Sequence, residues 1–107
     1  MSDISYANEK FYTAVDALCG GGPLRQRIFS AYMSFHTISH HPFDNKDLQT
    51  KFDEIMRRLT VVKDGDEDKG YVQNTLDKMS DRDAEEVSSL IVELAFNIQE
   101  ANTRTPQ

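Results

Sequence analysis

The sequence predicts an all-α fold, a compact five-helix bundle whose helices are mainly antiparallel. Apolar residues recur every three or four positions along most of the 107-residue chain, which is the period of a helix with one buried side. No segment alternates between apolar and polar residues as half-buried strands do. The connections between the periodic segments are short, which favours antiparallel neighbours, and residues 1–107 are expected to form one domain.

The first two predicted helices are separated by the segment CGGGP, residues 19–23. A first helix over about residues 3–18 ends there because glycine adopts the left-handed conformation of a helix cap, and Pro23 suits the first position of the next helix. The second helix runs from Pro23 to about residue 39 and stops before Pro42, since the residue before a proline is pushed out of the helical region. Their apolar stripes are Ile4, Ala7, Phe11, Ala14, Val15 and Leu18, and then Leu24, Ile28, Ala31, Tyr32 and Phe35.

Three further helices follow from the same periodicity. Asp44 or Asn45 is expected to cap a third helix over about residues 46–61. The acidic segment KDGDEDKG is a solvated loop, and a short fourth helix covers about residues 71–79. Ser80 begins the fifth helix, with the acid Asp83 three residues after this cap, and the polar tail from about residue 102 is expected to fray. The stripe of the fifth helix is Ala84, Val87, Leu90, Ile91, Leu94, Ile98 and Ala101.

The charge balance restricts the classes of partner. Twelve Lys and Arg against eighteen Asp and Glu give a formal net charge of −6, which opposes attraction to nucleic acid or anionic lipid. The basic cluster around Arg57 and Arg58 is small, so we do not expect nucleic-acid binding. The uncharged stretch from residue 28 to 43 is too short to span a bilayer. A single cysteine, Cys19, and the lack of a secretory pattern after Met1 favour a cytoplasmic location.

The segment IFSAYMSFHTISHHPF, residues 28–43, holds no Asp, Glu, Lys or Arg. Beside the main stripe of the second helix, a row formed by Phe29, Met33, His36 and His40 widens the uncharged surface to roughly 200° of the helix. Such a helix is either central in its bundle or covered by a partner. Val92 and Phe96 similarly lie almost opposite the stripe of the fifth helix. We therefore expect an interaction protein that forms a homodimer or binds another protein through these residues, namely Phe29, Met33, His36, His40, Val92 and Phe96.

A monomer is the simpler alternative, with the second helix central and Phe96 as a single exposed aromatic residue. A different class of function is a metal- or anion-binding regulator. His36 and His40, four residues apart, have the spacing of a metal chelate, although half-buried packing near the end of a helix explains them better. Residues 20–27 place Gly21 and Gly22 before a helix that carries Arg25 and Arg27 in its first turn, an arrangement that can hold an anion.

Neither a cofactor nor an enzymatic activity is expected from the sequence. The segment from Asp64 resembles a calcium loop, but the glycine comes one position late and the twelfth residue is Thr75 where a glutamate is needed. Cys19 lies at the end of a helix, where the dipole disfavours a thiolate nucleophile. The acidic residues fall on solvated faces, so no pair of a nucleophile and a base is predicted.

Overall fold

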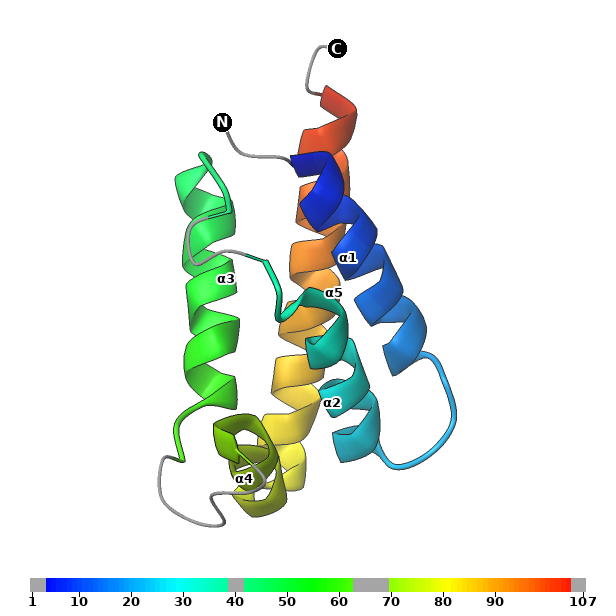
Figure 1. Cartoon of the computed structure of the whole chain (residues 1–107), viewed down its shortest axis with the longest axis vertical. Coiled ribbons are helices and arrows are strands. Elements are labelled where there is room, and N and C mark those ends of the chain that lie inside the picture. The colour runs from blue at the N-terminus through cyan, green and yellow to red at the C-terminus, as the bar shows by residue number, and fades with distance from the viewer. Residues whose placement is uncertain (1–3, 39–41, 63–69, 105–107) are drawn as a thin grey trace.

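The protein is a bundle of five α-helices in the computed structural model, which describes residues 4–38, 42–62 and 70–104. The helices are α1 (Ile4–Leu18), α2 (Leu24–Phe35), α3 (Lys46–Leu59), α4 (Gly70–Lys78) and α5 (Asp81–Arg104). Successive long helices run in opposite directions, and the short α4 crosses the end of the bundle (Figure 1). The predicted all-α, five-helix fold is therefore confirmed.

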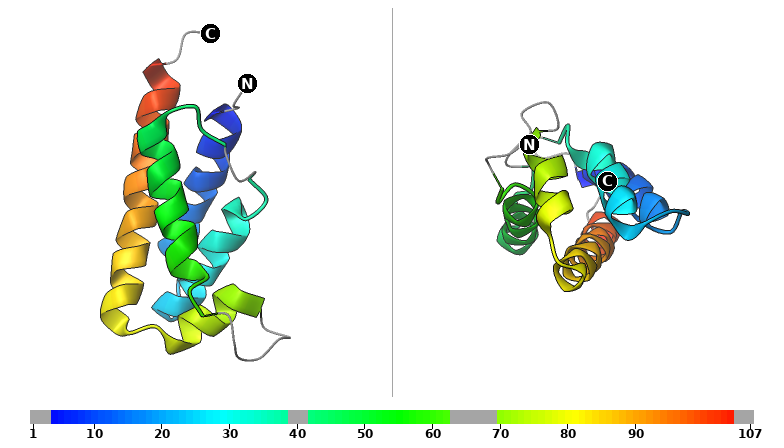
Figure 2. Two further views of the ribbon diagram at one scale, coloured as in Figure 1. Left: turned by 90° about the vertical axis from the view of Figure 1, so that its left-hand side faces the viewer. Right: turned by 90° about the horizontal axis from the view of Figure 1, so that it is seen from below.

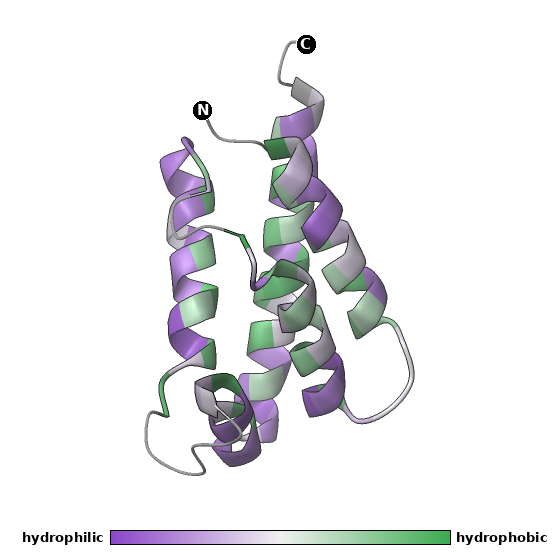
Figure 3. Cartoon of the chain, in the orientation of Figure 1, coloured by the Kyte–Doolittle hydropathy of each residue, from purple (hydrophilic) through white to green (hydrophobic). Residues whose placement is uncertain are grey.

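The longest helix, α5, packs against three other helices through one of its sides. It contacts α1, α2 and α3, and in the view from below in Figure 2 it lies at one edge of the bundle with the other helices on one side of it. Its inward side is apolar over the full length of the bundle, and apolar positions gather where the helices face one another (Figure 3). The fully buried residues on α5 are Ala84, Val87, Ile91, Leu94 and Ile98. The second helix is central in the monomer alternative; in the structure α2 packs mainly against α1 and also contacts α4 and α5.

Four phenylalanines join α1, α2 and α3 away from α5. Phe11 and Phe35 stack with their ring centroids 4.7 Å apart. Phe52 meets both rings edge-on, at 6.3 and 6.4 Å, and Phe43 lies edge-on to Phe52 at 5.9 Å. Offset stacks and edge-to-face contacts are the favoured geometries of aromatic pairs, so this cluster adds orientation to the apolar burial.

Two helix ends differ from the prediction. α2 ends at Phe35, four residues before the expected position, because the chain turns so that Ile38 and Phe43 are buried against the core. α5 continues to Arg104, past the tail expected to fray from residue 102. The hydroxyl of Ser5 on α1 donates to the side-chain oxygen of Asn102 at 3.1 Å, which ties the last turns of α5 to α1.

The helix starts agree more closely with the sequence. Asn45 caps α3, because its side-chain oxygen accepts hydrogen bonds from the backbone N–H groups of Asp47 and Leu48 at 2.8 and 3.2 Å. Ser80 accepts from the N–H of Asp83 at 3.1 Å and caps α5. Pro23 occupies the N-cap of α2 and not its first helical position, directly after Gly22, whose φ of +97° favours glycine.

Replacing Leu94 by alanine tests the central role of α5. Leu94 is fully buried, and removing a buried leucine side chain loses both transfer free energy and packing, about 2–5 kcal/mol of unfolding free energy. The half-buried Leu90 on the same helix is the matched control and should lose less. Urea denaturation of both variants measures the difference, and equal losses would contradict the assignment of Leu94 to the centre of the core.

Candidate functional site

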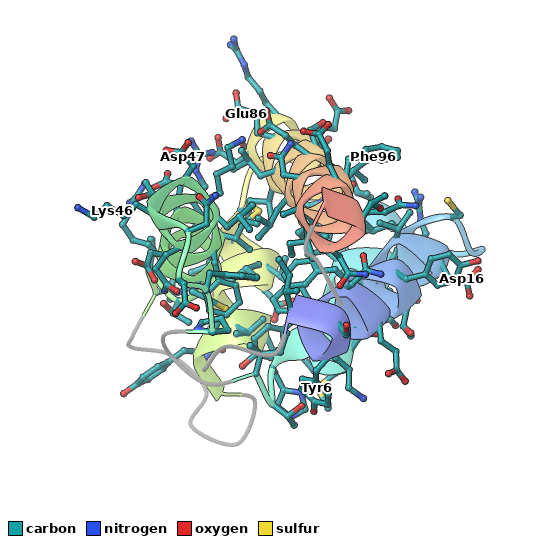
Figure 4. The ribbon with its side chains drawn as sticks, turned by 90° about the horizontal axis from the view of Figure 1, so that it is seen from above. Tyr6, Asp16, Lys46, Asp47, Glu86 and Phe96 are labelled. Atoms are coloured by element: carbon teal, nitrogen blue, oxygen red, sulfur yellow. The ribbon has the colours of Figure 1, made fainter. Side chains whose placement is uncertain are left out.

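The residues of the predicted interface lie on two sides of the molecule. On α2, Phe29 is half-buried against the core and Met33 is 48% exposed. On α5, Val92 is half-buried and Phe96 is 63% exposed. Phe96 projects from the side of α5 that faces away from α2 (Figure 4). The structure therefore does not bring the α2 residues and Phe96 onto one continuous surface.

Of the histidines, only His36 lies within the described residues. His36 is the C-cap of α2 and is exposed, with its Nδ1 atom 2.9 Å from the carbonyl oxygen of Met33 and its ring 5.6 Å from that of Tyr32. Because α2 has already ended, the four-residue spacing to His40 no longer means a shared helix face, and His40 lies outside the described residues. Within the described ranges, no group of three His, Cys, Asp or Glu side chains could hold a metal ion.

Arg27 completes the end of α1. Its Nη1 atom donates to the carbonyl oxygen of Leu18 at 2.8 Å, and its Nε atom donates to the carbonyl oxygen of Gly22 at 3.0 Å. Leu18 is the last residue of α1, so its carbonyl has no partner within the helix. The guanidinium supplies that partner and lies where the negative end of the helix dipole favours a cation.

Arg25, in the first turn of α2, links this helix to α4 and α5. Its Nε atom donates to the carbonyl oxygen of Leu76 at 3.0 Å, and its Nη2 atom donates to that of Met79, at the C-terminal end of α4. Its Nη1 atom also lies 3.0 Å from a carboxylate oxygen of Asp81, the first residue of α5. The two guanidinium groups expected to bind an anion with Gly21 and Gly22 are thus committed to contacts within the protein.

Ion pairs also connect α3 to α5. Arg57 and Arg58 both donate to the carboxylate of Glu54, with shortest distances of 2.7 and 2.8 Å, and Arg58 reaches Glu86 on α5 at 3.1 Å. The hydrogen bond from Arg57, followed by that from Arg58, lowers the pKa of Glu54 from 4.5 to about 2. The small basic cluster of the sequence is therefore largely neutralised by its own neighbours.

A cavity of about 300 Å³ lies between α3, α4 and the start of α5. Apolar side chains and Thr75 line it together with charged groups, namely Val61, Val62, Met79, Val87, Arg57, Arg58, Lys78 and Asp83. The hydroxyl of Thr75 accepts a hydrogen bond from the backbone N–H of Val62 at 3.0 Å. Among these lining residues no nucleophile is paired with a base, so the cavity offers space for an apolar group without a catalytic arrangement.

Two exposed aromatic residues, Tyr12 and Phe96, are flanked by acidic residues at the same spacing. Tyr12 on α1 is 76% exposed, and Phe96 on α5 is 63% exposed. Each ring has a carboxylate three residues before it and another four residues after it, and these spacings place the acids on the same side of the helix. Glu9, Tyr12 and Asp16 on α1 and Glu93, Phe96 and Glu100 on α5 are all exposed. Glu93 and Glu100 lie on the side of α5 that carries Asn97, which Lys51 of α3 contacts.

The sequence interpretation included Phe96 but missed Tyr12. The sequence predicts that the first helix has a single buried stripe and a charged outer side. Tyr12 lies on that outer side. Both helices carry the same spacing of an aromatic residue and two acids, ExxYxxxD in residues 9–16 and ExxFxxxE in residues 93–100.

The comparisons with known proteins return no relative. No family model, no curated protein and no solved structure matches the chain. Among the described residues, no helix has both the length and the apolar character needed to cross a membrane. A proposed function must therefore come from the surfaces described above.

Replacing Arg25 by glutamine tests its structural role. The substitution leaves the carbonyl groups of Leu76 and Met79 and the carboxylate of Asp81 without their charged partner. Because the Arg25 side chain is 34% exposed, we expect a loss of about 1–2 kcal/mol, below the upper range for hydrogen bonds to charged groups.

The control for Arg25 is Arg82→Gln. The Arg82 side chain is 88% exposed and lies 3.8 Å from Glu86, so its removal should change the unfolding free energy by less than about 0.5 kcal/mol. Urea denaturation at neutral pH measures both variants. If both variants lose the same unfolding free energy, Arg25 does not hold α4 in place.

The lowered pKa of Glu54 predicts a dependence of stability on pH. A carboxyl group whose pKa falls from 4.5 to about 2 on folding stabilises the protein above pH 4.5 and loses that contribution as the pH falls toward 2. The difference in melting temperature between the wild-type protein and Glu54→Gln should therefore narrow over this interval. Glu85→Gln, at an exposed acid outside the cluster, is the control. A difference for Glu54→Gln that stays constant from pH 7 to pH 2.5 would refute the prediction.

Proposed function

We propose that the protein is an interaction module, and that it self-associates through the outer side of α2. The observation that carries this proposal is the absence of Asp, Glu, Lys and Arg from residue 28 to residue 38 on a helix that is not central in the bundle. The outer side of α2 and of the turn after it exposes Ser30, Met33 and Thr37, beside the half-buried Phe29 and Tyr32.

The outer side of α2 is better suited than the rest of the protein surface to contact with a second copy of the chain. Each copy has a formal net charge of −6, so two copies repel one another unless they meet through an uncharged region. Contact through residues 28–35 of α2, the part of the helix after Arg25 and Arg27, buries no ionised side chain of α2, which avoids a desolvation cost of several kcal/mol per charge. The surface can also meet itself across a two-fold axis, the usual symmetry of a homodimer.

The side chains of this surface tolerate burial. The hydroxyl of Ser34 donates to the carbonyl oxygen of Ser30 at 3.3 Å within the helix, so it does not depend on water for a partner. Serine side chains are small and let two helices approach closely. Met33 has an unbranched side chain, which adapts to an irregular neighbour.

The size of the surface sets the expected strength of the dimer. α2 has 12 residues, and its charge-free part from residue 28 to residue 35 is about 12 Å long at 1.5 Å per residue. One helix of this length gives an interface at or below the lower end of the sizes found in stable complexes. We therefore propose a reversible dimer whose population depends on concentration.

The alternative function, a regulator that binds a metal or an anion, has less support. Arg25 and Arg27 are engaged with backbone carbonyls and Asp81, and His36 is an exposed helix cap. These contacts give the residues structural roles that do not require a ligand.

Sedimentation equilibrium over a wide concentration range tests self-association. The wild-type protein should show a concentration-dependent dimer, and Met33→Glu should weaken it at least tenfold, because dimerisation would bury two like charges. Val61→Glu is the matched control, since Val61 is 53% exposed and lies away from α2. A wild-type monomer at every concentration, or equal weakening by both substitutions, would overturn the proposal.

A further inference from the structure

We propose that the cavity between α3, α4 and the start of α5 binds a small apolar carboxylate, such as a short fatty acid. The carboxylate would contact the Thr75 hydroxyl and the Lys78 ammonium, and the apolar body would lie against Val61, Met79 and Val87. Helix α2, which the structure describes in full, contributes no residue to the lining, so the inference does not depend on self-association.

The cavity has the size and the mixed lining of a small-molecule site. Its volume of about 300 Å³ is at the lower end of the range for ligand pockets, which are mostly apolar with a few polar groups. Val87 is fully buried and Met79 is half-buried, so they form the inner part of the wall, whereas the exposed Val61 lies at the mouth. An apolar group can therefore enter from the surface and be covered on several sides.

Thr75 and Lys78 give α4 a polar side that borders the cavity. They are three residues apart, which makes them neighbours on the surface of the helix, and both line the cavity. Thr75 is 3% exposed, and its hydroxyl oxygen accepts the hydrogen bond from the backbone N–H of Val62. Within the described residues the hydroxyl hydrogen has no acceptor, so it can be donated to an oxygen of a ligand.

Lys78 supplies the charge for such a ligand. The other cations of the lining, Arg57 and Arg58, are both engaged with Glu54. Lys78 is exposed and makes no ion pair within the described part of the chain. A carboxylate has two oxygens, so one can accept the hydrogen bond of the Thr75 hydroxyl while the other accepts from the ammonium group.

Other ligand classes fit the cavity less well. Among the described residues of the lining, Asp83 is the one carboxylate, which is too few oxygen ligands for a Ca²⁺ ion. An apolar amine would be repelled by Lys78 and by the two arginines. Nucleic acid and anionic membranes present many phosphates to a broad surface, and the formal net charge of −6 opposes both. A small carboxylate with an apolar body matches both the polar and the apolar part of the lining.

The probe for this inference is sodium octanoate, titrated into the isotope-labelled full chain and followed by NMR. Octylamine, which has the same chain and the opposite charge, and acetate, which keeps the carboxylate without the chain, are the controls. We expect octanoate to bind at least tenfold more tightly than either. Each methylene group removed from the acid should weaken binding by about fourfold, because less apolar surface is buried. The shift changes should be confined to the end of α3, α4 and the start of α5.

Two pairs of variants locate the ligand. Lys78→Gln should weaken octanoate binding about fivefold. Lys46→Gln makes the same change of charge at an exposed residue at the opposite end of α3 (Figure 1) and should leave binding unchanged. Met79→Gln makes the apolar wall polar with a side chain of similar shape and should also weaken binding about fivefold. Met56→Gln, at another half-buried methionine that does not line the cavity, is its control.

Several results would overturn the inference. One is octylamine binding as tightly as octanoate, which would assign the cavity to a cation beside Asp83. Equal weakening within either pair of variants, or shift changes spread over the whole surface, would mean that octanoate binds nonspecifically. Met33→Glu should leave octanoate binding unchanged even where it abolishes the dimer. A parallel loss of both would place the ligand at the dimer contact and not in this cavity.

Discussion

The burial of one side of α5 is the constraint on which the other helices depend. This side stays apolar over a helix of 24 residues, and α1, α2 and α3 each cover part of it. Leu94 and Ile98 are fully buried as a result. α2 packs mainly against α1, and Ser30, Met33 and Thr37 on its outer side remain exposed.

Arginine side chains in this bundle are used to complete helix ends. The turn after α1 looks like an anion site in the sequence, because three glycines precede a helix with two arginines. In the folded protein the guanidinium groups already have acceptors, namely the carbonyl oxygens of Leu18, Leu76 and Met79 and the carboxylate of Asp81. Because these donors are already hydrogen-bonded within the protein, they do not form a site for an external anion at the glycine turn.

Local signals in the sequence were enough to locate the helices. Apolar periodicity and caps such as Asn45 act over a few residues, and all five helices were placed within a few positions of their ends. The early end of α2 could not be predicted in this way, because it depends on burial of Ile38 and Phe43 against distant helices. The partners of Arg25, which lie 51 and 54 residues further along the chain, likewise depend on the tertiary arrangement.

The contact between Arg25 and the end of α4 has a consequence for the order in which the protein opens. α4 has nine residues, fewer than a helix needs to persist alone in water. Its last carbonyls accept hydrogen bonds from Arg25 of α2, across a large separation in sequence, so the position of α4 depends on the docking of α2. In hydrogen exchange it should therefore behave as a separate cooperative unit, which detaches and reattaches while the remaining helices stay folded.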